Sequence, residues 1–291
     1  MHPANKALLV AAVAMHLVPA EVITAGMDVY RDQTALKVGG LSAGEAALVH
    51  AVFGADFNTG NIRKRYSGNE NACGETKSDE TVFVACVRRG SSAITFAAAD
   101  DFMDDYSRDG SVLGSRVATF MHEATHIWQH RTKAVSGGQC HSYDLPQRDI
   151  MNTAMTFDQY CSERQGQLVG YYAAFYLRPS QLNQTDLSGD SGKYFDRIRQ
   201  IVEAKFPRAT QLRMRMQTRA RVHLACFDAA AENKTAQASC NRRYYTNLQG
   251  QPLTTSARQV TFTLPDGQVR YPAVEAARRA GAATPAPRPN S

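Results

Sequence analysis

Apolar and polar residues alternate along the chain with two periods, one typical of helices and one typical of strands. The stretch LSAGEAALVHAVFG (residues 41–54) has apolar residues at helical spacing. It predicts one helix, with Ser42 as its N-cap and Gly54 as its stop. Residues 55–80 are polar and rich in Gly and Asn, so they predict a loop.

Two short apolar runs rich in β-branched residues follow. TVFVACV (81–87) and SAITFAA (92–98) are separated by RRGS and predict a pair of antiparallel strands. After a turn cluster, residues 111–131 contain no proline and carry apolar residues on roughly one side. This stretch predicts a long, mostly buried helix. A loop is expected over residues 135–149.

Three more helices are expected in the second half of the chain. One starts at Thr156, whose hydroxyl can cap it while Gln159 reaches back as the capping-box partner, and it continues to about Leu177. The other two are expected over residues 191–205 and 208–232.

The last part of the chain changes character. QVTFTLPDGQVRYPAV (259–274) alternates apolar and polar residues around a turn and predicts a β-hairpin, and the Ala-, Pro- and Arg-rich end predicts disorder. The whole pattern predicts an α+β fold, mostly helical, with a small antiparallel sheet preceding the long helix. The expected division is a signal segment at 1–20, a main domain at 21–205, a helical and β-hairpin region at 206–275 and a disordered tail at 276–291.

The charge of the chain favours an anionic environment. Its 291 residues carry 33 Lys and Arg against 27 Asp and Glu, a net charge of +6. No block of Lys and Arg is interleaved with aromatic residues, and RMRMQTRARVH (213–223) has the pattern of one charged helix face. We therefore expect no nucleic-acid partner. A basic surface suits an anionic envelope, an acidic protein or ordinary solubility.

The first twenty residues have the features of a secretory signal. Lys6 precedes an apolar run from Ala7 to Val18, and Ala20 is a small residue of the kind that a signal peptidase accepts. The run is too short to span a bilayer comfortably, so the alternative is a buried N-terminal helix. No later stretch qualifies as transmembrane. The protein is therefore expected to be secreted or periplasmic.

The chain has six cysteines, and none of them belongs to a CxxC pair. An even number suits disulfides in an oxidising compartment better than a cysteine-ligated metal site. We expect neighbours to pair, because each pair closes a short loop. The expected pairs are Cys73 with Cys86, Cys140 with Cys161, and Cys226 with Cys240. The alternative is six buried thiols in a cytosolic protein.

The long predicted helix contains the stretch FMHEATHIWQHR (120–131). On a helix, His122 and His126 project from one face a turn apart, so both imidazoles can reach a single ion at about 2.0–2.1 Å. Glu123 stands beside them, where it can hold a metal-bound water and accept its proton. The alternative is an amphipathic helix with exposed histidines.

A catalytic zinc needs a third protein ligand. His130 lies two turns from His122, and the outer pair is about 12 Å apart along the axis, so three such residues cannot close on one ion. His141 remains a candidate. Glu163, the one carboxylate inside an otherwise apolar and amide-rich segment, is the better one, because a buried carboxylate needs a cation or a proton. The alternative is a surface Glu163 paired with Arg164.

HEATHIWQHR followed by YCSERQGQLVGYYAAF resembles the gluzincin class of zinc peptidases. The chain is more closely similar to bacterial metallopeptidases related to Vgr proteins or to the core domain of extracellular contractile injection systems. In that group the first helix typically reads HExTHxxQ and the second carries Glu-x-Gln. The resemblance covers about residues 38–178 and implies a zincin-like fold. By position it implies the ligands His122, His126 and Glu163 and the catalytic residue Glu123.

The chain departs from the gluzincin pattern at one position. Gluzincins often have an aspartate four residues after the ligand glutamate, where it orients a zinc-bound histidine, whereas this chain has Gln167. An amide can accept the hydrogen bond but supplies no charge. The departure therefore implies weaker metal affinity or activity.

These features lead to a main hypothesis and an alternative. The main one is a zinc-dependent peptidase in which Glu123 assists the attack of a zinc-bound water on a peptide bond, while an upstream strand holds the protein or peptide substrate. The oxyanion needs a donor, for which Tyr143 is the first candidate and His141 and Tyr160 are others. The alternative is a catalytically weak or inactive zincin-like interaction protein, a component or cargo of a bacterial secretion apparatus.

Overall fold

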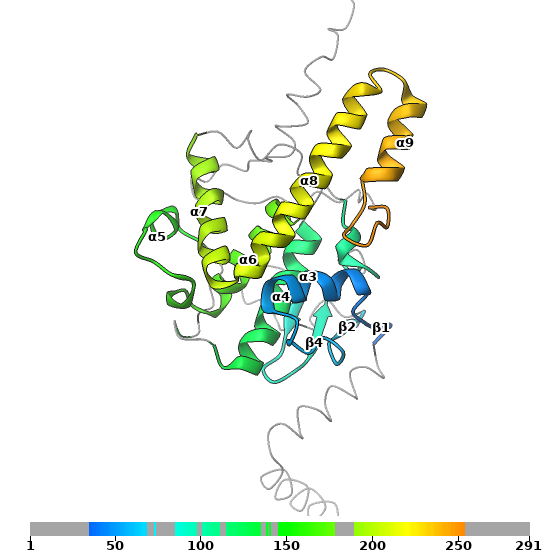
Figure 1. Cartoon of the computed structure of the whole chain (residues 1–291). Coiled ribbons are helices and arrows are strands. Elements are labelled where there is room, and N and C mark those ends of the chain that lie inside the picture. The colour runs from blue at the N-terminus through cyan, green and yellow to red at the C-terminus, as the bar shows by residue number, and fades with distance from the viewer. Residues whose placement is uncertain are drawn as a thin grey trace, which may run out of the picture.

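The computed structural model describes residues 35–68, 73, 85–97, 101–110, 115–134, 138, 140, 145–177 and 189–253. The described chain is a mixed α+β protein in which helices predominate and a small sheet lies at one end (Figure 1). The predicted signal segment, the hairpin at 259–274 and the tail at 276–291 lie outside the described residues. Within the described residues, no helix is long and apolar enough to cross a membrane.

Four strands form one sheet in the order β1-β2-β4-β3. Their bounds are Lys37–Gly40 (β1), Arg63–Tyr66 (β2), Ala85–Val87 (β3) and Ala93–Phe96 (β4). The predicted antiparallel pairing of β3 with β4 is confirmed. The expectation of an antiparallel sheet is wrong as a whole, because β2 runs parallel to β4 and the sheet is mixed.

Strand β2 lies inside the segment that we expected to be a loop. Its sequence, RKRY, lacks apolar alternation, so sequence periodicity gives no sign of a strand. Two of its basic side chains, Lys64 and Arg65, are nevertheless buried. A buried charge requires pairing, and that pairing exists only in the folded protein.

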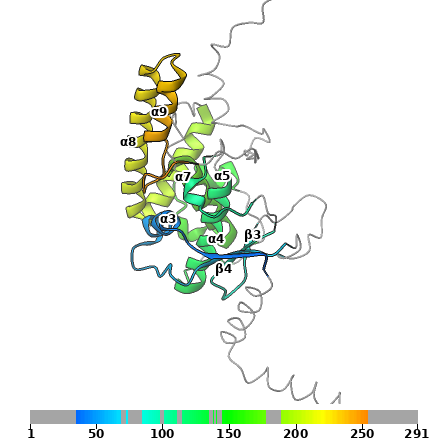
Figure 2. The same ribbon diagram turned by 90° about the vertical axis from the view of Figure 1, so that its right-hand side faces the viewer.

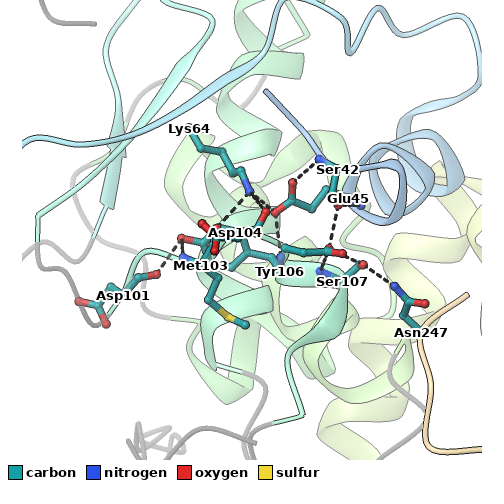
Figure 3. Close-up of polar contacts among 10 residues, drawn as sticks. Ser42, Glu45, Lys64, Asp101, Met103, Asp104, Tyr106, Ser107 and Asn247 are labelled. Atoms are coloured by element: carbon teal, nitrogen blue, oxygen red, sulfur yellow. Dashed lines mark hydrogen bonds and ion pairs between the residues drawn. The ribbon is translucent and has the colours of Figure 1, made fainter. Parts of the chain in front are cut away.

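The partner of Lys64 is Glu45, at 2.6 Å from Nζ to Oε1 (Figure 3). Lys64 also donates to the carbonyl oxygens of Met103 (3.1 Å) and Asp104 (2.7 Å). Glu45 accepts a further hydrogen bond from the backbone amide of Tyr106 at 2.8 Å. This buried ion pair thus ties the first helix, strand β2 and the turn at residues 101–109 to one another.

That first helix, α3 (Ala43–Phe53), is the one predicted from LSAGEAALVHAVFG. Ser42 and Glu45 form its capping box, and Gly54 follows it with a φ of 100°, a backbone conformation that favours glycine. A short 3-10 turn, η2 (Tyr106–Arg108), comes before the next helix.

The long helix predicted over 111–131 is α4 (Ser115–Thr132), and it packs along α6 (Ser162–Tyr176). The prediction that the second helix begins at Thr156 is wrong. Thr156 and Gln159 do form a capping box, but it caps only the 3-10 turn η3 (Phe157–Gln159), after which the backbone is extended. The helix restarts where the Ser162 amide donates to the Gly138 carbonyl and Cys161 is bonded to Cys140.

Four other helices complete the described fold. They are α5 (Gln147–Met151), which begins in the expected loop at 135–149 and extends past it, α7 (Gly189–Lys205), α8 (Pro207–Ala229) and α9 (Lys234–Tyr244). Helices α7 and α8 match their predictions, whereas α9 was not predicted because its sequence is largely polar. Helices α8 and α9 form a hairpin that extends away from the sheet (Figure 2).

Aromatic rings link the elements at the base of this hairpin. Trp128 of α4 lies 5.5 Å from Phe53 and 5.3 Å from Phe206 between ring centroids, and Phe157 lies 5.1 Å from Phe206. All three predicted disulfides, Cys73–Cys86, Cys140–Cys161 and Cys226–Cys240, are confirmed.

Candidate metal centre

His122, His126 and Glu163 come together between α4 and α6. The two Nε2 atoms lie 3.0 Å apart, and Oε2 of Glu163 lies 3.2 Å from Nε2 of His122 and 3.3 Å from that of His126. A tetrahedral ion with bonds of about 2.0–2.1 Å separates its ligand atoms by about 3.3–3.4 Å. The three atoms therefore form a triangle close to the size that one such ion requires.

A chain of amides fixes which nitrogen of His126 carries the proton. The side-chain nitrogen of Gln165 donates to the carbonyl oxygens of Phe157 (3.2 Å) and Tyr160 (2.8 Å), so its oxygen is left to accept from Nε2 of Gln129 at 2.9 Å. The oxygen of Gln129 then faces Nδ1 of His126 at 2.8 Å. Nδ1 must be the donor, so in the neutral ring the lone pair lies on Nε2, the nitrogen that faces Glu163.

A side-chain amide also contacts Nδ1 of the second histidine, His122. Oε1 of Gln167 lies 3.2 Å from its Nδ1, which leaves Nε2 free to face the other two groups. The glutamine at the position where gluzincins often carry aspartate therefore reaches the histidine. It supplies a hydrogen bond without a charge.

Two glycines of α6 make room for His122. A Cβ atom added to Gly166 would lie 2.9 Å from Nε2 of His122, and one added to Gly170 would lie 2.8 Å from the carbonyl oxygen of Ala118. The imidazole thus packs directly on the glycine face of the neighbouring helix.

The charges around the centre favour a cation beside Glu163. Burial raises the pKa of Glu163, but its hydrogen bonds with His122 and His126 outweigh burial and hold the pKa well below its usual range. Burial lowers the pKa of His126, yet the hydrogen bond with Glu163 and the charges of Glu123 and Glu163 raise it to about 9. A site that attracts a proton so strongly also suits a metal ion.

Glu123 lies beside the triangle and is only 6% exposed. Burial raises its pKa, while His122, His126 and the backbone amide of Val87 act in the opposite direction. Its Oε2 atom is buried without a hydrogen-bond partner among the described residues. Two observations therefore support the fit to a metal: three ligand atoms converge, and a neighbouring carboxylate oxygen has no hydrogen-bond partner in the described part of the chain.

The other predicted site residues do not join this group. His130 is absent from it, and its Nδ1 is buried without a hydrogen-bond partner among the described residues. The hydroxyl of Tyr160 donates to the carbonyl of Asp149 at 2.9 Å, so this ring is a packing element. Tyr143 and His141 lie outside the described residues.

The contacts and burial also argue against the two alternatives, a surface Glu163 paired with Arg164 and a helix with exposed histidines. Arg164 pairs with Asp149 at 3.1 Å and with no oxygen of Glu163. His126 is 9% exposed, so the helix does not simply display its histidines to solvent.

Sequence reasoning missed the residues that support the ligands. Gln129 and Gln165 look like ordinary polar positions on a helix, and only the carbonyl oxygens that they contact give them a role. Gly166 and Gly170 did carry a signal, because two glycines four residues apart inside a helix indicate a close approach by another chain segment.

Comparisons of the chain with models of protein families, with curated proteins and with solved structures found no match. The class is therefore defined by the molecule itself, as a disulfide-bonded, mostly helical α+β protein with a His, His, Glu group that can bind a metal ion.

Proposed function

We propose that this protein is a zinc-dependent peptidase with a zincin-like fold of the gluzincin kind. The observation that carries the proposal is the convergence of His122, His126 and Glu163 beside the buried carboxylate of Glu123. Two imidazoles and one carboxylate form the donor set of a catalytic zinc site, which keeps one coordination position for water or substrate.

Each residue has a defined task in this proposal. His122, His126 and Glu163 hold the ion, which lowers the pKa of a water and polarises a carbonyl when it is bound there. Glu123 takes the proton from the attacking water and passes it to the leaving amine. Its raised pKa suits a group that must both accept and return a proton near neutral pH.

The sheet supports a place for the substrate. Strand β3 lies at the edge of the sheet, and the backbone amide of Val87, its last residue, interacts with Glu123. The outer side of β3 therefore runs past the proposed general base. An extended peptide added to this edge would bring its carbonyl carbons close to the metal ligands.

The disulfides support a compartment. Three disulfides, together with described helices that are all too short or too polar to span a membrane, are consistent with an extracellular or periplasmic protein. We propose secretion through the N-terminal signal, with a protein or peptide as the substrate.

Metal content and one conservative variant test the proposal. We expect about one zinc per chain by elemental analysis, lost in His126→Ala and in Glu163→Ala. Glu123→Gln should retain the zinc and lose hydrolysis of a mixed peptide library by a factor of about 100 or more, measured by mass spectrometry. Full cleavage by Glu123→Gln would contradict the assigned base.

The second candidate function is a zincin-like interaction protein without turnover, associated with a bacterial secretion apparatus. Gln167 favours it, since an amide contacts His122 where a charged aspartate is more common. A chain that binds one zinc and cleaves nothing in the peptide library would support this candidate over the peptidase.

A further inference from the structure

The net positive charge of the protein is concentrated in one element. The α8–α9 hairpin, residues 207–244, holds eight Arg and Lys residues against two Asp and Glu, so its net charge is +6. The rest of the chain holds 25 Arg and Lys and 25 Asp and Glu, so it is neutral. The basic character that sequence composition assigns to the whole protein therefore belongs to the hairpin alone.

The outer half of the hairpin projects beyond the body of the protein (Figures 1 and 2). Between residues 221 and 239 only His223 is buried, so this part has almost no apolar core. The Cys226–Cys240 disulfide braces it, and Nε2 of His223 meets Oδ1 of Asn241 at 2.8 Å. This projecting part buries almost no apolar surface, so core packing does not explain why a disulfide holds it together.

One face of α8 is exposed along its whole length. The buried stripe consists of Ala209, Leu212, Met216, Ala220 and His223. On the opposite face, Met214 is 58% and Val222 is 42% exposed, and they lie among the exposed side chains of Arg215 and Arg221. Within the part of the chain that the structure describes, neither of these two arginines has an ion-pair or hydrogen-bond partner.

We propose that this face of α8 docks the protein on an anionic phospholipid surface. Guanidinium groups bind phosphate oxygens through paired hydrogen bonds, and Arg215 and Arg221 flank Met214 and Val222 on the two sides of the exposed face. Met214 and Val222 are placed to enter the headgroup region to a shallow depth. The three disulfides are consistent with an extracellular or periplasmic protein, which would meet membrane lipids in that compartment.

Other anionic partners fit the face less well. A protein interface is usually anchored by Trp, Tyr or Phe, and no aromatic residue of α8 or α9 is fully exposed. Binding to single-stranded nucleic acid uses aromatic platforms for the bases, which the face also lacks. The proposal does not depend on zinc or on peptidase activity.

Vesicle flotation with the full chain tests the proposal. We expect binding to vesicles of phosphatidylcholine with about one third phosphatidylglycerol, weakened by salt, and little binding to phosphatidylcholine alone. The variant Arg215→Glu/Arg221→Glu should bind at least about tenfold more weakly. The matched control is Arg63→Glu/Arg148→Glu, which changes the net charge equally at two exposed positions outside the hairpin and should bind within about twofold of the parent chain.

Each outcome bears on the proposal. Equal losses in the hairpin and control variants would overturn it, because net charge alone would then explain adsorption. Absence of vesicle binding at low salt, or tighter binding to a short DNA duplex or to a polyglutamate peptide than to the vesicles, would also overturn it. If the glutamate variant fails to fold by circular dichroism, Arg215→Gln/Arg221→Gln replaces it and should lose about threefold or more.

Discussion

The oxygen of Gln129 lies 2.8 Å from Nδ1 of His126, and this contact decides which nitrogen of the imidazole is left to bind a metal. Replacing Gln129 by leucine removes the acceptor while keeping a side chain of similar size. We expect Gln129→Leu to bind zinc about 10- to 100-fold more weakly, measured by competition with a chromogenic chelator.

The matched control is Gln211→Leu, at an exposed position of α8. It should leave zinc affinity unchanged. An unchanged affinity in Gln129→Leu would show that the ring orientation does not depend on the amide chain, and the role assigned to Gln129 and Gln165 would be wrong.

Gly166 offers a second test of the centre. An added Cβ would lie 2.9 Å from Nε2 and 3.0 Å from two carbon atoms of the His122 ring, so Gly166→Ala should push the ligand aside. The same substitution favours the helix intrinsically by up to about 1 kcal/mol. We therefore expect zinc affinity to fall at least about tenfold while the thermal midpoint of the metal-free protein changes little.

Gly170→Ala is the comparison for Gly166→Ala. Its Cβ would meet the carbonyl oxygen of Ala118 at 2.8 Å, a backbone atom that cannot rotate away. This variant should lower the thermal midpoint of the metal-free protein by several degrees. If both variants lower the thermal midpoint of the metal-free protein equally, Gly166 is needed for the packing of α4 on α6 and not for the position of the His122 ring.

The buried pair of Lys64 and Glu45 predicts a pH-dependent defect. Lys64→Met leaves Glu45 without its cation and should lower the free energy of unfolding by about 3–5 kcal/mol at pH 8 in urea titrations. Burial already raises the pKa of Glu45 in the folded protein, and losing Lys64, which lowers it, raises it further. The folded state then binds the proton more tightly than the unfolded state, so part of the lost stability should return as the pH falls through that raised pKa.

The double variant Glu45→Gln/Lys64→Met separates charge from packing. It removes the unpaired carboxylate, so it should be more stable than Lys64→Met at pH 8 and should lack the gain at low pH. A single variant that loses less than about 1 kcal/mol would contradict the account of a buried, fully paired ion pair.

The Cys140–Cys161 disulfide holds the start of α6, two residues before Glu163. Replacing both cysteines by alanine should lower the free energy of unfolding by about 3 kcal/mol and weaken zinc binding, because the third ligand loses its anchor. Cys226→Ala/Cys240→Ala in the hairpin should cost a similar stability and leave zinc affinity unchanged. Equal zinc affinity in both double variants would show that α6 holds Glu163 without the disulfide.

The sequence by itself determined the features that depend on local order. The helical spacing of apolar residues predicted α3, α4, α7 and α8. The expectation that neighbouring cysteines pair and close short loops predicted the three disulfides. The spacing of His122 and His126 on one helix placed two ligand atoms on one face without any knowledge of packing. Glu163 followed from its position as a lone carboxylate in an apolar segment.

Only the tertiary structure decided the rest, because these features depend on groups far apart in the chain. Strand β2 pairs with β1 and β4 and buries Lys64 against Glu45, and no pattern within RKRY shows these contacts. Helix α6 begins at Ser162 and not at Thr156, because the contact with Gly138 and the disulfide to Cys140 lie outside the local sequence. The position of the proton on the His126 ring depends on backbone carbonyls that orient Gln165, which in turn orients Gln129 against Nδ1 of His126. The periodicity of a sequence predicts which residues share one face of a helix or strand, whereas tertiary packing determines which groups that face contacts.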